Sequence, residues 1–416
     1  MVEINGERLL GSLRTLRGFG AVGAGVVRPT FSDADMAARS WLRDQMAAAG
    51  LDACIDGVGN VVGRSRNAGP ALIVGSHSDT QPEGGWLDGA LGVMYAIETA
   101  RALAEDPSTS HLAADTVAWA DEEGTYSSFL GSRSFVGQLP SAAWAETNAA
   151  GESIAEAIER VGLAQTSVAS FEPGRHVGYL EAHIEQGPHL EEQRQQIGIV
   201  TSIVGMCALQ VTFVGEQNHA GTTPMARRKD AGVALFEYCV RLRQRFEALA
   251  GPATVWTIGN ARLEPGAESI VPGSAWCGLQ FRDADVHVLE SFETAAHDLA
   301  AEMTAEGPVE VSTARRRDVV APVDMDPELR QHLIGAAAGR VDASWVEMPS
   351  AAAHDAMVLA THLPCAMLFV PSIGGISHDF AEDSSDDDII TGCRVLADAV
   401  VSTLQNSPPA RHRPDR

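Results

Sequence analysis

The sequence predicts an α/β protein with a mostly parallel sheet, into which a smaller α+β domain is inserted. Three short, nearly all-apolar runs indicate strands that are buried on both faces: residues 71–75 (ALIVG), 116–120 (TVAWA) and 365–370 (CAMLFV). A fourth run, at 177–184 (VGYLEAHI), alternates more. Amphipathic helical stretches such as 90–103 and 153–161 lie between these runs, and strands that alternate with helices are typical of a parallel sheet.

The middle of the chain has a different pattern. Alternating runs LQVTFVG, TVWTIG and SAWCGLQF indicate strands with one exposed face, and helical stretches at 230–249 and 287–306 separate them. We therefore predict a first domain made of residues 1–208 and 323–405, with residues 209–322 inserted as a second domain. The polar, proline-rich tail at 406–416 is expected to fray.

Length and charge exclude several classes of protein. The chain has 416 residues, which favours two domains, and a formal net charge of −25, which argues against nucleic acid or an anionic membrane surface as partner. No apolar run approaches the roughly 18–20 residues of a membrane helix. The six cysteines are scattered without a CxxC pair, which suits reduced thiols in a cytoplasmic protein.

Histidines and acids follow the predicted strands at the point where each strand ends. In an open parallel sheet, reactive groups lie beyond the carboxyl ends of the strands. The groups at these positions are His77 and Asp79, Glu122 and Glu123, His183, and His378. Asp88 opens a helix in the glycine-rich turn 84–89, between the first two strands. We expect all of these side chains to converge on one edge of the sheet.

Three imidazoles with two or three carboxylates form a metal-binding set. Imidazole nitrogen and carboxylate oxygen suit Zn²⁺, Mn²⁺ or Co²⁺, and five ligands exceed the needs of one tetrahedral ion. Two ions about 3.5–4 Å apart that share a carboxylate would use all five, and such a pair can activate water and polarise a carbonyl group. Glu122 and Glu123 are adjacent, and on an extended segment one would face the metal and the other the water. Asp79 would orient the His77 ring.

Six motifs occur in a fixed order along the chain. They are GSHSDTQPEGGWLDGALGV (75–93), DEEGTYSSFLGSRSFVG (121–137), YLEAHIEQGPHLE (179–191), NHAGTTPMARRKDA (218–231), HDAM (354–357) and GGISHDFAE (374–382). In these motifs the chain resembles metal-dependent amidohydrolases of the M20 peptidase clan, within the group of N-carbamoyl-L-amino acid hydrolase, allantoate amidohydrolase and β-ureidopropionase. The resemblance implies a catalytic domain, an inserted lid and dimerisation domain, and a homodimer. It also implies two divalent ions per subunit, zinc before manganese, cobalt or nickel.

The resemblance also assigns roles to individual residues. His77 and His183 would bind one metal, Glu123 and His378 the other, and Asp88 would bridge them. Glu122 would be the general base, although a second ligand or a solvated acid is the alternative; Asp79 would support His77.

The remaining implied roles concern the substrate. The residues are Gln186, His219, Ser269, Arg282 and His354. Gln186 would contact the substrate, and His219 would reach the neighbouring subunit's active site and steady the oxyanion. Arg282 would clamp the substrate's α-carboxylate, a role that suits a guanidinium, with pairing to a nearby Asp as the alternative. His354 would be a substrate contact or a hydrogen-bonded core histidine.

Several positions depart from the family pattern without removing a ligand or the base. Ser269 replaces an Asn that helps hold the carboxylate, and an ordinary loop hydroxyl is the alternative there. The other departures are Thr125-Tyr126 for Ser-Arg, Ala351 and Ala353 for glycines, and Asp379-Phe380 for Asn-Pro. All are expected near the substrate, so the identity of the substrate stays open.

The favoured function is removal of the carbamoyl group from an N-carbamoyl-L-amino acid or a related ureido acid, with release of ammonia and CO₂. Allantoate, an N-acyl amino acid or a peptide is the alternative substrate, and a catalytically silent carboxylate-binding relative is a remote alternative. The GxGxxG pattern at Gly18–Gly23 is rejected as a dinucleotide site, because a polar helical stretch precedes it and no helix opens after it.

Overall fold

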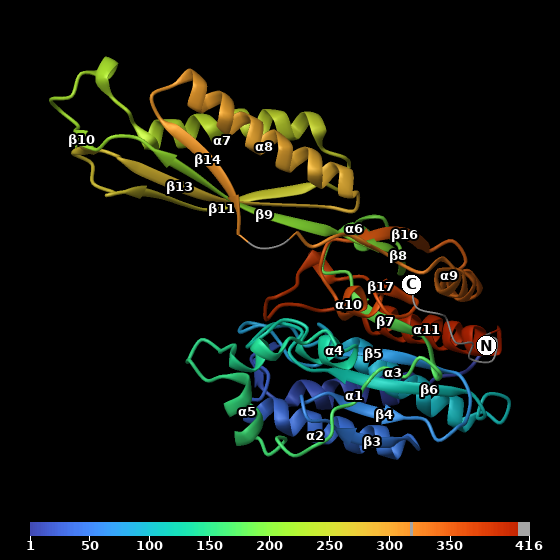
Figure 1. Cartoon of the computed structure of the whole chain (residues 1–416). Coiled ribbons are helices and arrows are strands. Elements are labelled where there is room, and N and C mark those ends of the chain that lie inside the picture. The colour runs from blue at the N-terminus through green and yellow to red at the C-terminus, as the bar shows by residue number, and fades with distance from the viewer. Residues whose placement is uncertain (317–318, 407–416) are drawn as a thin grey trace. The chain divides into compact units, whose positions relative to one another are not determined.

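A computed structural model describes residues 1–316 and 319–406 (Figure 1). The chain divides into two compact units: Met1–Thr201 with the chain from Met325 onward, and Ser202–Asp324. The second unit begins at Ser202, ahead of the predicted boundary at residue 209. Strand β9 (Gly205–Val214) begins before the alternating run on which that prediction was based. The expected frayed tail lies at 407–416, outside the described residues, and helix α11 continues through Asn406.

A nine-stranded sheet, in the order β15–β8–β17–β7–β5–β6–β4–β3 with β16 paired to β8, forms the centre of the first unit. Its edge strand β15 and the last two residues of β8 fall within residues 202–324, at the boundary of the second unit. The strands are β3 (Asp52–Ile55), β4 (Val61–Arg64), β5 (Ala71–His77), β6 (Ala113–Trp119), β7 (His176–Ile184), β8 (Ile197–Ile203), β15 (Val323–Asp324), β16 (Trp345–Ser350) and β17 (Cys365–Val370). The central strands β17, β7, β5 and β6 run parallel, as predicted. On the two sides, β8, β15, β4 and β3 each pair antiparallel with the neighbouring strand, so the sheet is mixed.

The helices of this unit are α1 (Gly6–Gly18), α2 (Asp33–Ala48), α3 (Ala90–Glu105), α4 (Leu130–Phe135), α5 (Ile154–Arg160), α6 (His189–Glu192), α9 (Pro327–Val341), α10 (Asp355–Leu359) and α11 (Asp386–Asn406). The helix predicted at 90–103 is confirmed as α3, but it is not amphipathic, because it is buried on all sides over these residues. It packs on β5, β6 and β7 and also contacts α1 and α11. Its buried Glu98 pairs with Arg8 at 2.8 Å.

The GxGxxG segment forms a small hairpin. Helix α1 ends at its first glycine, strand β1 (Ala21–Val22) lies within it, and strand β2 (Gly25–Val26) follows and pairs antiparallel with β1. A dinucleotide site needs a strand before the glycines and a helix after them. The structure of this segment therefore agrees with the rejection of a dinucleotide site.

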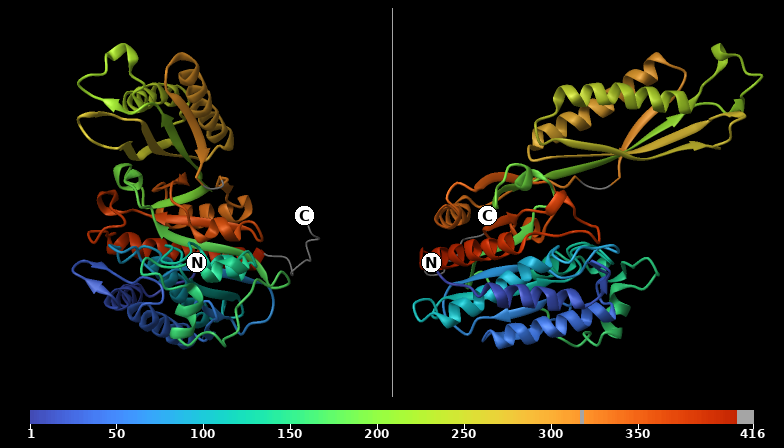
Figure 2. Two further views of the ribbon diagram at one scale, coloured as in Figure 1. Left: turned by 60° about the vertical axis from the view of Figure 1, so that its left-hand side comes forward. Right: turned by 180° about the vertical axis from the view of Figure 1, so that it is seen from behind.

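The second unit is a four-stranded antiparallel sheet in the order β11–β13–β9–β14. Its strands are β9, β11 (Val255–Glu264), β13 (Ser274–Asp283) and β14 (Glu310–Arg315). Helices α7 (Ala231–Leu249) and α8 (Val286–Glu306) cover one face of this sheet (Figure 2). Between sheet and helices, the rings of Phe246 and Phe292 stack with centroids 4.0 Å apart. A two-stranded ribbon, β10 (Asn218–His219) with β12 (Ile270–Val271), completes the unit.

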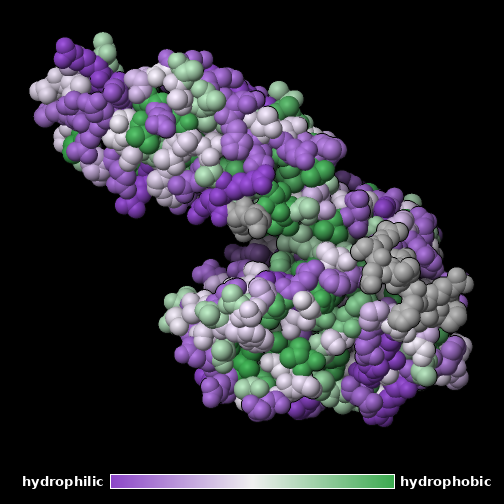
Figure 3. Space-filling view, viewed as in Figure 1, coloured by the Kyte–Doolittle hydropathy of each residue, from purple (hydrophilic) through white to green (hydrophobic). Residues whose placement is uncertain are grey.

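Hydrophilic residues dominate the face drawn in Figure 3, and apolar residues form only small patches there. Among the described residues, none of the helices combines the length and the apolar character that a membrane crossing requires.

Candidate metal centre

The four central strands bring their carboxyl ends to one edge of the sheet. His77 ends β5, His183 lies near the end of β7, and the loops after β6 and β17 carry Glu123 and His378. Two groups of possible metal ligands meet there: His77, Asp88 and His183, and Asp88, Glu123 and His378. Within each group the ligand atoms lie within 4.8 Å of one another. Asp88 belongs to both groups.

Each oxygen of Asp88 faces a different group. Oδ1 lies 3.0 Å from Nε2 of His183 and 3.6 Å from Nε2 of His77. Oδ2 lies 3.2 Å from Nε2 of His378. In the second group, Oε1 of Glu123 lies 3.8 Å from the same His378 nitrogen, and this oxygen is buried without a hydrogen-bond partner in the described residues.

The histidine rings are oriented by backbone carbonyls. The Nδ1–H of His183 donates to the carbonyl of Ile184 at 2.9 Å, and the Nδ1–H of His77 donates to the carbonyl of Asp79 at 3.1 Å. Both Nε2 lone pairs therefore face the carboxylate of Asp88, which is the arrangement that a divalent cation requires of its ligands. Asp79 therefore contacts the His77 ring through its backbone carbonyl. Its carboxylate is 3.8 Å from Nδ1 and accepts from the Glu123 N–H at 3.2 Å.

Residues 121–127 form a bend. Asp121 has a positive φ of 57°, and its carboxylate accepts the N–H groups of Thr125, Tyr126 and Ser127 at 2.7–3.0 Å. The prediction of an extended segment for Glu122 and Glu123 is therefore wrong, although the two side chains do take different neighbours. Oε2 of Glu122 lies 3.7 Å from Nε2 of His77.

Three residues in the loops of this edge have a strained backbone. Asp121, Gln186 and His378 have φ values of 57°, 59° and 53°, in the left-handed region that residues other than glycine rarely adopt. These three residues lie in the loops that follow β6, β7 and β17, respectively. Such strain persists only where the surrounding structure enforces it, and it is concentrated at functional sites.

Burial and mutual repulsion shift the pKa values of these groups. Burial and the nearby Asp88 raise the pKa of Glu123 to about 7, and burial raises the pKa of Glu122 well above its ordinary value. The hydrogen bond to Asp88 raises the pKa of His378 to about 9. Although burial opposes it, the carboxylates of Glu122 and Asp88 raise the pKa of His77. Without cations, the centre therefore retains protons.

The amide of Gln186 lies among these ligands. Its Nε2 is 3.3 Å from Oδ2 of Asp88, 3.3 Å from Nε2 of His378 and 3.1 Å from the hydroxyl of Ser377. Its backbone N–H donates to Ser372. The structure thus brings this residue to the cluster.

His354 is buried behind the cluster. Its ring makes an edge contact with the ring of His183, with centroids 4.7 Å apart, and its Nε2 lies 2.9 Å from the hydroxyl of Ser350. Burial lowers its pKa well below the ordinary value, so the ring is neutral. These contacts suit a histidine that packs against and orients His183.

The remaining predicted residues lie in the second unit. His219 pairs with Ile270 in the two-stranded ribbon, and the Ala220 N–H donates to the Ser269 carbonyl at 2.9 Å, so His219 and Ser269 are neighbours. Arg282 lies near the opposite end of β13, opposite Met206, and contacts Gln280 at 3.3 Å. Eight residues of strand, about 27 Å, separate Arg282 from Ser274 beside the ribbon.

Comparison with known proteins identifies the family of this chain. Residues 73–402 match the family model described as peptidase family M20/M25/M40. The chain belongs to this family. It is 34% identical to an N-carbamoyl-L-amino acid amidohydrolase of Geobacillus stearothermophilus, over 97% of this chain and 99% of that protein. It is 32% identical to the allantoate amidohydrolase of Escherichia coli K12, over 93% and 95%. A crystal structure of a hydantoinase/carbamoylase family amidase from Burkholderia phymatum superposes with a TM-score of 0.93 at 48% identity, covering 97% and 99%.

Two further side chains of this M20 family protein contact the cluster, and the sequence did not predict their roles. Nε2 of Gln81 donates to Oε2 of Glu123 at 2.5 Å. Glu382 accepts from the backbone N–H of Asp88 at 3.0 Å. Both lie inside motifs that the resemblance uses, at positions 81 and 382. Their roles depend on contacts with residues distant in the chain, which spacing alone does not reveal.

The expectation that all departures from the family pattern border the substrate is wrong for Tyr126. Its ring packs against Phe31 with centroids 5.7 Å apart, and its hydroxyl donates to Glu152 at 2.7 Å. The strong hydrogen bonding of Asp121 turns the chain so that this side chain enters an apolar cluster beside α5. Phe380 lies close to Gly25 of the β1–β2 hairpin, where a side chain on that glycine would collide with its ring.

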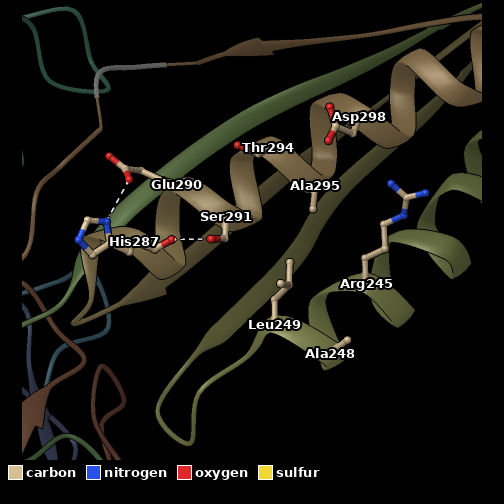
Figure 4. A pocket seen from close by; sticks show the side chains of 9 residues that line it. All are labelled: Arg245, Ala248, Leu249, His287, Glu290, Ser291, Thr294, Ala295 and Asp298. Atoms are coloured by element: carbon tan, nitrogen blue, oxygen red, sulfur yellow. Dashed lines mark hydrogen bonds and ion pairs between the residues drawn. The ribbon is translucent and has the colours of Figure 1, made fainter.

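A hollow of about 660 Å³ lies between α7 and α8 in the second unit of this M20 family protein (Figure 4). Its lining includes Arg245, Ser291 and Asp298, and the exposed His287 pairs with Glu290 at 3.3 Å. It is wide open to solvent, and neither ligand group lies in it. The candidate ligands thus lie at the sheet edge and not in this hollow.

Proposed function

We propose that this protein hydrolyses a ureido C–N bond, removing the carbamoyl group from an N-carbamoyl-L-amino acid or a related ureido acid. The observation that carries the proposal is the pair of ligand groups that share Asp88. The printed activities of the relatives, N-carbamoyl-L-amino acid amidohydrolase and allantoate amidohydrolase, support this class of substrate. The products would be ammonia, CO₂ and a free amino acid.

The five ligands fit two divalent cations. His77 and His183 would hold one, Glu123 and His378 the other, and Asp88 would contribute one oxygen to each. The orphaned Oε1 of Glu123 supports this division, as does the donation of both Nδ1–H groups to backbone carbonyls, which leaves Nε2 as the ring atom that faces Asp88. Zinc suits the nitrogen and oxygen donors best, with manganese, cobalt and nickel as alternatives. Such ions would polarise the ureido carbonyl and make an adjacent water more acidic.

Glu122 would act as general base. It is close to the ligands, 3.7 Å from Nε2 of His77, but belongs to neither ligand group. Its carboxylate would take a proton from the attacking water and return it to the departing nitrogen. A raised pKa suits a group that must hold this proton between the two transfers.

The second unit would complete the substrate site from two copies of the chain. Arg282 would pair bidentately with the substrate carboxylate, while His219 would steady the developing oxyanion, with Ser269 beside it. Arg282 and the ribbon are about 27 Å apart along β13, much farther than a small ureido acid extends. One copy therefore cannot bring both to one substrate, and a second copy would supply His219. This unit would thus act as lid and dimerisation domain.

A surface suited to that second copy lies on α7. Val233, Phe236 and Val240 are about half exposed or more, at 49%, 60% and 53%, and recur on one face of the helix. Strand β11 forms one edge of the sheet, and an unpaired edge can join its counterpart in a symmetric dimer. Phe236→Glu should shift sedimentation from dimer to monomer and abolish activity. An active monomer would contradict the two-copy site.

The substrate is tested with a panel on one metal-analysed preparation. Ammonia release from N-carbamoyl-L-amino acids is compared with release from allantoate, and with deacylation of N-acetyl amino acids and dipeptides. We expect fastest turnover on the carbamoyl amino acids. Allantoate is the second candidate, because an allantoate amidohydrolase is among the relatives. Faster cleavage of N-acetyl amino acids would overturn the proposal.

A further inference from the structure

Glu382 connects two loops of the candidate centre that are almost 300 residues apart in the chain. The side chain is buried, with an exposed fraction of 2%. Its Oε1 accepts the backbone N–H groups of Leu87 and Asp88 at 3.1 and 3.0 Å. Its Oε2 accepts the hydroxyl hydrogen of Ser377 at 2.8 Å. One carboxylate therefore holds the turn that carries Asp88 and the residue that precedes His378.

Gly85 makes room for this carboxylate. A Cβ atom at position 85 would lie 1.9 Å from both Cδ and Oε1 of Glu382, which no packed structure allows. The contact is with the functional end of the side chain, so any side chain at 85 would displace the carboxylate from the Asp88 turn. The glycine and the glutamate thus form a matched pair.

The loop that carries His378 depends on such a connection. The side chain of His378 is half exposed, whereas those of His77 and His183 are almost fully buried. Packing therefore holds His77 and His183 but leaves His378 to its loop. That loop closes on itself through the Ile373 N–H and the Asp383 carbonyl at 2.9 Å. Glu382 joins this loop to the Asp88 turn at two backbone N–H groups, and the Nε1–H of Trp86 adds a longer bond to Asp383 at 3.3 Å.

A further hydrogen bond extends the connection. The hydroxyl of Ser377 donates to Glu382 and accepts from the amide of Gln186 at 3.1 Å. The same amide lies 3.3 Å from Oδ2 of Asp88 and 3.3 Å from Nε2 of His378. Glu382 is thereby coupled to both ligands, through the backbone on one side and through side chains on the other.

We propose that Glu382 is a positioning residue that sets the separation of Asp88 from His378 and so determines affinity for the ion held by Asp88, Glu123 and His378. This inference rests on the proposed function, because it presupposes a cation in that group. The ion held by His77, Asp88 and His183 depends less on Glu382, since burial fixes its two histidines.

The test measures metal binding directly. Chelator-stripped protein is titrated with Zn²⁺ against a competing indicator, and the visible absorption of the Co²⁺-loaded protein reports ligand geometry. Loss of an outer partner of a metal ligand weakens metal binding about 10–100-fold. We expect Glu382→Ala to weaken the weaker of two sites by about this factor and to alter the Co²⁺ spectrum. Gly85→Ala should reproduce both effects, and Ser377→Ala should give a smaller version.

A structural role alone is excluded by a matched control. Asp115 is also a buried carboxylate that accepts a backbone N–H, from Ser65 at 2.7 Å, but it lies at the amino end of β6, away from the metal ligands. Asp115→Ala should lower the melting temperature and leave both metal affinities unchanged. Glu382→Gln retains an acceptor for the Leu87 and Asp88 N–H groups and should recover most of the lost affinity.

Other results would contradict the role of Glu382 or separate it from the proposed function. If Glu382→Ala and Gly85→Ala bind two ions as tightly as the wild type, the inference is wrong, whatever happens to stability. If Glu382→Ala does not fold, Gly85→Ala and Ser377→Ala carry the same comparison. A wild-type protein that binds fewer than two ions overturns this inference together with the two-ion centre. Failure to hydrolyse carbamoyl amino acids while Glu382→Ala weakens metal binding refutes only the proposed substrate.

Discussion

Nε2 of His183 lies 3.0 Å from Oδ1 of Asp88, although the ring has already donated its Nδ1–H to a backbone carbonyl. A lone pair and a carboxylate at this distance repel each other unless a positive charge lies between them. In the protein that charge is either a metal ion or a proton.

Metal-free protein should lose stability as the pH rises. Glu123, with an ordinary pKa of 4.5, has its pKa raised to about 7 by burial, and the bond to Asp88 raises that of His378 from 6.5 to about 9. Both groups bind protons more tightly in the folded state, so their stabilisation is complete below the unfolded pKa and is lost as the pH rises through the folded one. Melting temperatures of chelated protein should fall from pH 5 to pH 9.

Two controls accompany that measurement. Metal-loaded protein should not show this fall, because cations replace the protons, and Glu123→Gln should flatten the lower part of the chelated profile. Chelated protein that becomes more stable over the same range would contradict the assignment.

Asp88→Asn should remove both ions, because this carboxylate faces both ligand groups. We expect metal content to fall from two ions per chain to less than one, and activity to fall below about a hundredth of wild type. The measurements are elemental analysis and ammonia release on the same sample. Asp387→Asn, at an exposed position in the first turn of α11, is the control and should change neither.

Glu122→Gln should separate catalysis from metal binding. General acid–base catalysis contributes roughly 10²–10⁴-fold, so kcat should fall by that factor while metal content stays at two. Glu123→Gln should instead lose metal, because its Oε1 belongs to a ligand group. A fully active Glu122→Gln enzyme would show that another group takes the proton.

Two inactive variants should restore each other if the site is built from two copies. His219→Ala and Arg282→Ala are each expected to have little activity. In a mixed dimer, one of the two sites receives intact Arg282 from one chain and intact His219 from the other. Unfolding and refolding an equimolar mixture should therefore recover roughly a quarter of wild-type activity, from random pairing. No recovery, with mixed dimers present, would mean that both residues act from one chain.

Gly89→Ala should weaken metal binding through His77. The added Cβ would lie 2.4 Å from Nε2 of that ring, and the φ of 63° disfavours any side chain. Gly137→Ala is a matched control, because its φ is 73° and no atom lies within 4 Å of the new Cβ. Both variants should lose about 1–2 kcal/mol to the left-handed backbone, but only Gly89→Ala should lose metal affinity. Equal metal binding in the two variants would contradict the contact.

The central part of the fold could be predicted from the sequence because its strands are buried on both faces. Their all-apolar runs locate β5, β6, β7 and β17, and the rule about strand ends then points to the metal cluster. The short antiparallel strands could not be predicted in this way. Strand β3, for example, alternates between exposed and half-buried residues, which gives no strong apolar signal.

The finer features of the site depend on tertiary contacts. His77 binds to the backbone carbonyl of Asp79 and not to its carboxylate, and the chain bends at Asp121. No local sequence pattern encodes the hydrogen bonds that fix these two features. The burial of α3 on all sides likewise depends on α1 and α11, which lie elsewhere in the chain. The role of Glu382 could not be predicted for the same reason, since the backbone N–H groups that it accepts are almost 300 residues away in the chain.

The chain enters and leaves the second unit through neighbouring strands. Ile203 of β8 pairs with Val323 of β15, so the two crossing points are hydrogen-bonded partners. A two-residue turn joining them would convert β8 and β15 into an ordinary hairpin and leave the strand order of the large sheet intact. Residues 204–322 thus form an insertion whose two ends lie next to each other. Gene rearrangement can exchange, lengthen or delete such an insertion without changing the strand order of the large sheet.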